Sequence, residues 1–321
     1  MKKILLIQTG GTIAMQSNNA DDSPELDIDR WSALLHEEIP ELSQIAKVEA
    51  ARLFFEDSSD ISPGHWSALI RYIGEQYKNF DGFVILHGTD TMAYTASALS
   101  FGLQQLGKPV ILTGSQVPMS NLRSDARRNL VNALEMATLP LCEVAICFND
   151  HLFRGNRSTK MSIGDFDAFA SPNFPPLAEI GLNIELHHSR NCPDLPLAAY
   201  PAFDPGVFLL KIFPGLSPKL LERIDLSGVK ALVIEAFGSG NFPVQGSHSL
   251  LPFFRHCLSD RKLLVITSQA PYDSVDLGKY ASGRQAGELG AVGAGDMTTE
   301  AVLTKIMYLL GQRLSRKEIT R

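Results

Sequence analysis

The sequence has no hydrophobic run long enough to cross a membrane. No stretch approaches the roughly 18 consecutive apolar residues that a transmembrane helix needs. The apolar run Ile4–Ile7 follows Lys2 and Lys3, but it is too short for a signal peptide and leads directly into a glycine turn. We therefore expect a cytoplasmic protein that does not associate with membranes.

An excess of positive charge is also missing. Lys and Arg together number 29 against 35 Asp and Glu, which gives a formal net charge of −6. A chain with this balance lacks the overall field that holds nucleic-acid phosphates. Nucleic-acid binding through bulk electrostatics is therefore excluded as a main activity, and we expect no nucleic-acid partner.

Cysteine is scarce as well. The sequence has four cysteines, Cys142, Cys147, Cys192 and Cys257, which are widely spaced and form no CxxC pair. This pattern is typical of reduced thiols and argues against a zinc site. We expect four free cysteines and no metal site.

What the sequence does contain is typical of a globular protein with about two domains. It has 321 residues, of which 45% are hydrophobic and 20% are charged. Short apolar runs alternate with segments of helical period, which favours βαβ units and a parallel sheet covered on both faces. In the first half, strands are expected at residues 3–8, 52–55, 83–87, 110–113 and 144–148, and helices at 63–77, 91–106 and 125–137.

Proline-rich sequence from residue 171 to 205 interrupts this alternation, and we interpret it as an interdomain connection. The pattern then resumes, with strands expected at 208–213, 231–236 and 263–267 and helices at 218–224, 249–258 and 298–314. The predicted fold class is α/β, with a larger N-terminal domain built on a mainly parallel sheet and a smaller C-terminal α/β domain. The predicted boundaries are 1–190 for the first domain, 191–206 for the linker and 207–321 for the second domain.

A glycine turn, Thr9–Ala14, directly follows the first expected strand. In open parallel sheets, ligands bind beyond the carboxyl ends of the strands, and glycines allow backbone amides to approach them closely. The turn lacks both full nucleotide-binding glycine patterns, which weakens the nucleotide interpretation. A tight structural turn and an anion-binding turn remain as alternatives.

Two further turns carry hydroxyl groups, His87–Met92 and Asp57–Asp60. Residues of both turns can simply cap the helices that follow. The alternative is chemical, because a hydroxyl nucleophile needs a base or cation nearby and an amino-acid substrate needs a carboxylate for its ammonium group. Asp90 suits the second purpose. Lys160 is either a solvated lysine or a cation that folds beside Thr89 and stabilises its alkoxide.

In this order, the motifs resemble those of the bacterial-type L-asparaginase family. The resemblance covers nearly the whole chain, and the short Asp57–Asp60 motif resembles the cytoplasmic type I branch, because type II enzymes usually have Gln at the position of Ser59. The matching segments are Thr9–Ala14, Asp57–Asp60, His87–Met92, Leu112–Pro118, Arg154–Lys160 with Phe166–Pro172, and Gly295–Ala301.

The resemblance implies hydrolysis of L-asparagine to L-aspartate and ammonia without a metal or an organic cofactor. It implies that Thr12 attacks the side-chain amide carbon, and that Thr89 acts with Lys160 and Asp90. It also implies a homodimer or homotetramer with active sites shared between subunits, in which Asn241 is the contact from a neighbouring subunit. The implied substrate-binding residues are Gly11, Asp57, Ser58, Ser59, Gly88, Thr89, Asp90 and Asn241.

The sequence departs from the family pattern in two places. Family members usually have a tyrosine on the mobile loop after the first motif, but there is none between Thr12 and Arg30. Some type I enzymes bind asparagine at a regulatory site formed by a threonine and a cysteine. Thr159 fits the threonine position, whereas Ala270 stands where the cysteine is expected.

These departures leave other functions open. The chain can be an asparagine-binding protein that has lost turnover, or an amidase of another amide with altered loop chemistry. An ammonia-supplying subunit of a glutamyl-tRNA amidotransferase shares the chemistry, although that subunit normally has an extra N-terminal domain, which we do not expect here. A nucleotide-dependent oxidoreductase shares only the fold class. The sequence does not decide between asparagine and glutamine or between dimer and tetramer.

Overall fold

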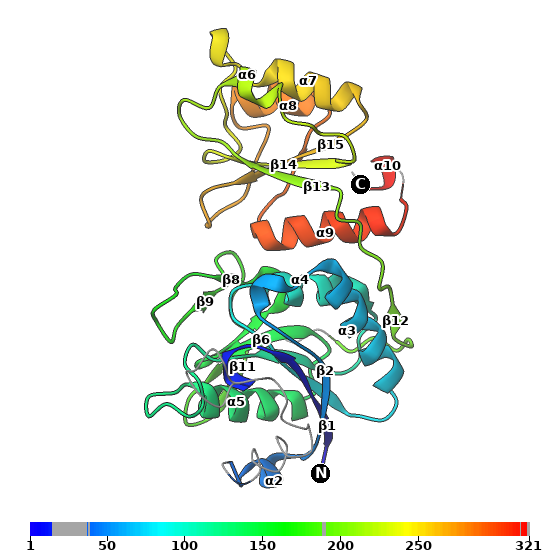
Figure 1. Cartoon of the computed structure of the whole chain (residues 1–321), viewed down its shortest axis with the longest axis vertical. Helices are drawn as coiled ribbons and strands as arrows, with labels where there is room; N and C mark the ends of the chain where they lie inside the picture. The colour runs from blue at the N-terminus through cyan, green and yellow to red at the C-terminus, as the bar shows by residue number, and fades with distance from the viewer. Residues whose placement is uncertain (15–36, 38, 188–190, 315, 320–321) are drawn as a thin grey trace. The chain divides into compact units, whose positions relative to one another are not determined.

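A computed structural model describes residues 1–14, 37, 39–187, 191–314 and 316–319. The chain divides into two compact units, Met1–Pro201 and Ala202–Arg321, and each contains both helices and strands (Figure 1). No helix in the described part of the chain is long and apolar enough to span a bilayer.

The first unit is built on an eight-stranded sheet with the order β11-β10-β7-β6-β5-β3-β1-β2. The five strands from β6 to β2 are parallel, whereas β7, β10 and β11 extend the sheet in antiparallel fashion. The strands are β1 (Lys3–Gly10), β2 (Lys47–Glu56), β3 (Gly82–Leu86), β5 (Val110–Thr113), β6 (Val144–Phe148), β7 (His151–Arg154), β10 (Ala178–Ile180) and β11 (Ile184–Leu186).

Helices cover both faces of this sheet (Figure 1). Ile4 and Leu6 of β1 are fully buried in a cluster with Leu130 of α5. Their neighbours Leu5 and Ile7 are also buried, because successive side chains of a strand point to opposite faces and both faces are covered. On one face lie α2 (Leu42–Ile45) and α5 (Ala126–Thr138), and on the other α3 (Pro63–Gln76) and α4 (Met92–Gly102).

Short elements complete the first unit. They connect the main strands and helices and include the turns that the motifs occupy. These are η1 (Thr12–Ala14), η2 (Ser58–Asp60), β4 (Leu103–Gln104), η3 (Gly155–Arg157), β8 (Thr159–Lys160), β9 (Phe169–Ala170) and β12 (Ala198–Ala199).

The second unit has a four-stranded parallel sheet with the order β13-β14-β15-β16. Helices α7 and α8 lie on one face and α9 on the other (Figure 1). The elements are β13 (Val207–Lys211), α6 (Pro218–Leu221), β14 (Ala231–Ala236), η4 (Gly246–His248), α7 (Leu251–Ser259), β15 (Leu263–Ser268), α8 (Ala281–Leu289), β16 (Val292–Gly293), α9 (Thr299–Gly311) and α10 (Arg316–Ile319).

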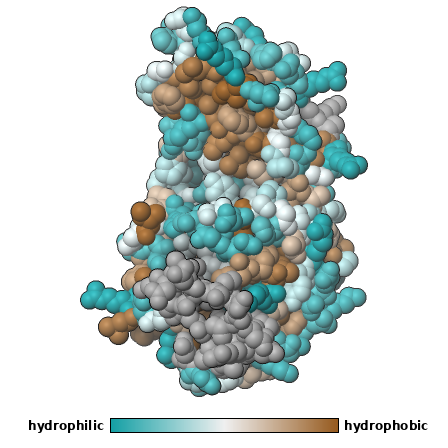
Figure 2. Space-filling view, in the orientation of Figure 1, coloured by the Kyte–Doolittle hydropathy of each residue, from teal (hydrophilic) through white to brown (hydrophobic). Residues whose placement is uncertain are grey.

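An apolar surface lies on the second unit. Figure 2 shows apolar side chains gathered on one of its faces, over β13 and α6. The exposed large apolar residues of these segments include Leu209, Phe213 and Leu220. We refer to these three residues as the β13 patch.

The predicted fold class is confirmed, but some predicted segments are wrong. The stretch 171–205 is not only a connection, because its first part forms the edge strands β10 and β11 of the first sheet. Each has three residues, too few to show a periodic pattern. The helix α8 was missed because its sequence contains two glycines. At one of these, Gly283, an added Cβ would lie 2.7 Å from the Leu277 carbonyl oxygen, so close packing requires glycine there.

The prediction of four free cysteines is also wrong. Cys142 and Cys192 form a disulfide with a Cα–Cα distance of 5.3 Å. The pair is separated by 50 residues in the sequence, and the chain returns to the start of β6 only after the edge strands are complete. Sequence spacing therefore gave no sign of the contact. Cys147 and Cys257 are free and buried.

Candidate active site

Turns that follow neighbouring parallel strands meet at the carboxyl edge of the first sheet. The backbones of the turns after β1 and β3 are in contact, because a Cβ added to Gly11 would lie 2.4 Å from the Gly88 nitrogen. The turn after β2 is equally close, since a Cβ added to Gly88 would lie 2.7 Å from Ser58 Oγ. Gly11 also has a φ of +84°, a conformation that favours glycine. The three motifs thus form one site.

Thr89 and Asp90 share a lysine that comes from a distant part of the chain. Lys160 lies in β8, and its Nζ donates hydrogen bonds to Thr89 Oγ1 and to Asp90 Oδ1, both at 2.7 Å. The lysine side chain is 15% exposed, whereas that of Asp90 is 66% exposed. Lys160 is therefore not a solvated surface lysine, and an exposed carboxylate lies beside a cation and a hydroxyl.

Gln116 determines the direction of the Thr89 hydroxyl. Its Nε2 donates to the carbonyl oxygens of Asp165 at 3.1 Å and of Ser162 at 3.5 Å. Because carbonyl oxygens only accept, this assigns the amide orientation and leaves Oε1 to accept from Thr89 Oγ1 at 3.1 Å. The Thr89 proton thus points to Gln116, while an oxygen lone pair faces Lys160. We missed this role, although Gln116 lies in the conspicuous turn after the 110–113 strand.

A buried carboxylate anchors the Gln116 turn. The Asp125 oxygens accept from the backbone nitrogens of Gln116 and Val117 at 3.0–3.2 Å. Asn129 donates to Asp125 Oδ2 at 3.0 Å and to the Gly114 carbonyl at 2.9 Å. Because the first turn of α5 holds the loop in this way, Gln116 reaches Thr89 from a fixed backbone.

A buried chain of hydrogen bonds supports the Thr89 turn from behind. His87 Nδ1 lies 2.7 Å from the Gly88 carbonyl oxygen, which can only accept, so Nδ1 carries the proton. Nε2 then accepts from Thr95 Oγ1 at 2.9 Å, and this hydroxyl accepts from Trp66 Nε1 at 3.1 Å. Burial lowers the pKa of His87 to about 4. The imidazole is therefore neutral and fixes the Gly88 carbonyl.

The Ser58–Ser59 turn is ordered by its own acid. Asp57 Oδ1 accepts from the Ser59 backbone nitrogen at 2.8 Å and from Ser59 Oγ at 2.7 Å. The backbone bond, followed by the hydroxyl bond, lowers the pKa of Asp57. The turn is also tied to the Thr89 turn, because Thr91 Oγ1 donates to the Ser58 carbonyl at 2.6 Å. Asp57 therefore caps its loop and orients Ser59.

Two predicted site residues remain, Thr12 in the first unit and Asn241 in the second. Thr12 is half-buried and opens η1, directly after Gly11. Residues 15–36, where a loop tyrosine is missing from the sequence, lie outside the described residues. Asn241 belongs to the second unit, where its Oδ1 accepts from Ser282 Oγ at 2.9 Å.

Comparison with known proteins gives the family. The model described as Asparaginase, N-terminal matches residues 3–192, and the model of the Glutaminase/Asparaginase C-terminal domain matches residues 206–321. The chain belongs to the asparaginase family. The predicted family is thus confirmed, and the glycine turns and the Lys160 strand lie within its N-terminal domain.

Individual asparaginases are similar over almost the whole chain. L-asparaginase 1 of Escherichia coli K12 is 42% identical over 327 residues, covering 99% of this chain and 94% of that protein. The crystal structure of L-asparaginase I from Vibrio cholerae has a TM-score of 0.90 at 38% identity, covering 99% of this chain and 95% of that one. The structure of the thermostable L-asparaginase from Thermococcus kodakarensis has a TM-score of 0.89 at 36% identity, and it covers 99% of this chain and 95% of that one.

Two further observations concern metal ligands and an unsatisfied hydroxyl group in the candidate active site. Among the described residues, no group of three or more His, Cys, Asp or Glu side chains is placed to hold a metal ion. The Ser115 hydroxyl, which precedes Gln116, is buried and has no hydrogen-bond partner in the described part of the chain. Because buried polar groups are rarely left unsatisfied, Ser115 is a candidate ligand contact that sequence analysis missed.

Proposed function

We propose that this chain hydrolyses the side-chain amide of L-asparagine to L-aspartate and ammonia. The observation that supports the proposal most directly is the position of Lys160 Nζ, 2.7 Å from both Thr89 Oγ1 and Asp90 Oδ1. A cation, a hydroxyl and a carboxylate meet there, beside the glycine turn that leads to Thr12. The similarity to L-asparaginases over 99% of the chain agrees with this activity.

The reaction begins at Thr12. Its Oγ attacks the side-chain amide carbon, and the backbone N–H groups of Gly11 and Gly88 stabilise the oxyanion. Ammonia leaves and an acyl ester forms on Thr12, which water then hydrolyses to release L-aspartate. Thr89 has one of two roles: it activates this water, or it adjusts the site while Lys160 stabilises negative charge on its oxygen.

The substrate's other groups have matching partners. Asp90 pairs with the α-ammonium group, since its carboxylate is 66% exposed even though it also binds Lys160. Ser58 and Ser59 bind the α-carboxylate, with Asp57 holding Ser59 in place. The unsatisfied Ser115 hydroxyl supplies a further contact from the turn after β5.

We also propose a cytoplasmic homodimer or homotetramer in which Asn241 reaches the active site of a neighbouring subunit. The β13 patch supports association, because exposed apolar surfaces of this kind mark interaction sites. Sedimentation velocity measures the state, and Leu209→Glu in the patch is expected to shift it toward monomer.

A second candidate is supported by one sequence feature. Residues 13–29 contain no tyrosine, whereas the family usually has one on this loop. In this second candidate function, the altered loop makes the chain an asparagine-binding protein or an amidase that acts on another amide. Tight binding of asparagine without hydrolysis favours this candidate, and rapid turnover excludes it.

The decisive experiment is coupled ammonia release across a wide range of L-asparagine concentrations, with L-glutamine in parallel. Thr12→Ala and Thr89→Val are each expected to reduce kcat by about a thousandfold or more. Thr138→Val, at the end of α5, is the matched control and is expected to keep wild-type activity, since within the described residues its hydroxyl donates to the Glu135 carbonyl of its own helix. If Thr12→Ala releases ammonia as fast as the wild type does, the proposal is wrong.

A further inference from the structure

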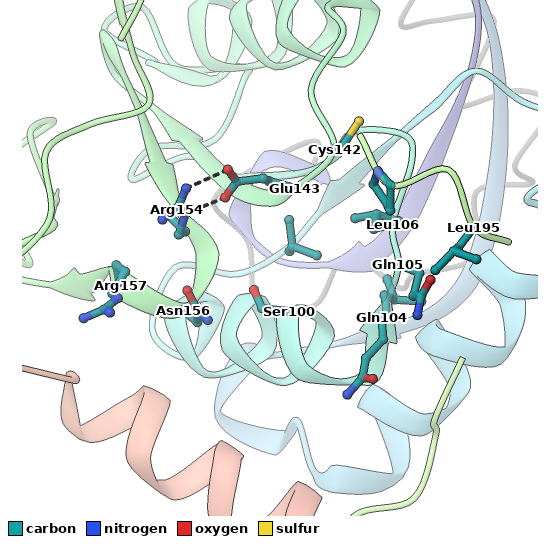
Figure 3. Close-up of a pocket in the computed structure, with 13 residues that line it drawn as sticks. Ser100, Gln104, Gln105, Leu106, Cys142, Glu143, Arg154, Asn156, Arg157 and Leu195 are labelled. Carbon is teal, nitrogen blue, oxygen red and sulfur yellow. Dashed lines mark hydrogen bonds and ion pairs between the residues drawn. The ribbon is translucent and has the colours of Figure 1, made fainter. Parts of the chain in front are cut away.

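The Cys142–Cys192 disulfide lies beside a cavity that is separate from the candidate active site. The cavity has a volume of about 640 Å³ and is lined by Cys142 and by Pro193, the residue after Cys192 (Figure 3). Cys192 is exposed, whereas Cys142 is only 4% exposed. A small molecule therefore has access to the bond from solvent and from the cavity.

The cavity is locally positive although the chain is not. Its charged side chains are Glu143, Arg154 and Arg157, and the chain as a whole has a net charge of −6. Glu143 accepts from Arg154 Nε at 2.5 Å and Nη2 at 2.7 Å, as the dashed lines of Figure 3 show. The lining thus contains two guanidinium groups and one carboxylate, an excess of one positive charge that favours a small anion. Its polar side chains are Ser100, Gln104, Gln105 and Asn156.

The two free cysteines are not accessible to small thiols or oxidants. Cys147 and Cys257 are both fully buried. Burial raises the pKa of the Cys147 thiol, and it raises that of Cys257 to about 11. Because the thiolate is the reacting species, both remain unreactive in the folded protein.

We propose that Cys142–Cys192 is a thiol–disulfide exchange site for small thiols that carry carboxylate groups, and that its opening lowers the activity of the site around Lys160. The second half of this proposal rests on the proposed function. The Cα–Cα distance of 5.3 Å lies within the range that disulfides normally span. In the cytoplasm, where we place the chain, it meets a reducing thiol pool.

The exchange proceeds in two balanced steps. The thiolate of the small molecule attacks Cys192 Sγ, forms a mixed disulfide and expels the Cys142 thiolate, which takes up a proton. A second small thiol attacks the mixed disulfide and releases Cys192 as a thiol. In total, the protein disulfide is reduced to two thiols, and two small thiols are oxidised to one small disulfide.

The connection to activity runs through the loop that the disulfide closes. Lys160 lies within the segment between Cys142 and Cys192. Glu143, the neighbour of Cys142, pairs with Arg154 at the end of β7, and η3 leads from there to Lys160. Opening the bond removes the constraint at the ends of this loop. Since small displacements of a catalytic group are costly, we expect kcat to fall by about tenfold.

The first test measures exchange on the folded full-length protein. Mercaptopropionate, mercaptoethanol and mercaptoethylamine are compared at equal thiolate concentration and low salt, and mass spectrometry identifies the modified cysteines. We expect a mixed disulfide at Cys192, a released thiol at Cys142 and no reaction at Cys147 or Cys257, and we expect the acidic thiol to react fastest. Arg157→Gln should slow that reagent selectively, and salt should reduce its advantage. The reverse order, which the overall charge of −6 favours, overturns recognition in the cavity.

The second test measures ammonia release from L-asparagine by the oxidised protein, the reduced protein and the Cys142→Ser/Cys192→Ser variant. Reduced protein and variant should show the same lowered kcat, and only the wild type should recover it on reoxidation. Cys257→Ala is the control and should respond like the wild type. Full activity of the reduced protein overturns the regulatory role. Exchange at these cysteines without any asparagine hydrolysis instead refutes the proposed function and leaves the exchange site standing.

Discussion

The two units share a parallel α/β architecture but use the polar groups at their strand ends differently. In the second unit, Ser268 Oγ donates to the Gly238 carbonyl at 2.6 Å, and Gln269 Nε2 donates to the carbonyls of Ile212 and Glu235 at 2.6 and 2.9 Å. These side chains satisfy the backbone of their own unit. In the first unit, Lys160 instead contacts the side chains of Thr89 and Asp90.

The difference shows that the architecture alone does not make a site. A polar side chain that binds a backbone carbonyl completes the fold. A cation, a hydroxyl and an exposed carboxylate that bind one another can also bind and change a ligand. The predictions below separate these two uses of polar and glycine residues, starting with the largest expected effect.

The largest effect is expected from Gly11→Ala. An added Cβ would lie 2.4 Å from the Gly88 nitrogen, and the φ of +84° would strain alanine in any case. We expect loss of asparagine hydrolysis and a decrease of about 2–5 kcal/mol in the free energy of unfolding. Gly287→Ala in α8 of the second unit is the control, since nothing lies within 4 Å of its added Cβ. Gly287→Ala should stabilise the protein slightly. Equal losses of activity and stability in both variants would contradict the difference between the two units.

Lys160→Met should reduce kcat by about 10²- to 10⁴-fold, because it removes the cation beside Thr89 while nearly keeping side-chain volume. Stability should change little, since the Asp90 carboxylate left behind is 66% exposed. Steady-state kinetics measure the effect. In the second unit, Lys230→Met breaks the ion pair with Asp204 and should leave kcat unchanged. Wild-type kcat in Lys160→Met would place this lysine outside the chemistry.

Acid should destabilise the first unit through His87. Its pKa is about 4 in the folded protein against an ordinary value of 6.5. Between these values, the unfolded chain binds more protons at His87, so the free energy of unfolding increases with pH. The contribution is complete above pH 6.5 and is lost as the pH falls through 4. It amounts to about 3 kcal/mol.

Urea unfolding between pH 4 and 7, followed by tryptophan fluorescence, measures this dependence. Trp66 lies in the first unit and the sequence has no tryptophan after it, so the signal does not come from the second unit. His87→Gln should flatten the slope. A slope that persists in His87→Gln assigns the pH dependence to other groups.

The smallest effect is expected from Trp66→Phe. It removes the Nε1 donor to Thr95 at 3.1 Å and reduces the size of a ring that is 5% exposed. We expect a loss of about 1–3 kcal/mol in stability, measured by circular dichroism during urea unfolding. Thr95→Val, which also leaves His87 Nε2 without its donor, should cost more and lower kcat. Equal effects of both variants would show that His87 does not need Thr95.

Much of the fold could be predicted because its signals are local. The buried strands β1, β3, β5 and β6 appear as apolar runs, and the helices that alternate with them predict a parallel core. The edge strands β10 and β11 could not be predicted, because three residues carry no period. The disulfide could not be predicted either, since it depends on where the chain returns after those strands.

The sequence by itself determined the turns, the motifs and the family. Each depends on neighbouring residues, such as the glycines before Thr12 and Thr89. The family resemblance implied that Lys160 acts with Thr89, 71 residues away, but the tertiary structure alone decided that the two side chains bond directly and that Gln116 orients the hydroxyl. It also decided that Cys142 meets Cys192. The physical reason is that hydrogen bonds and disulfides depend on distances of a few ångströms, which strand order and packing set and sequence spacing does not.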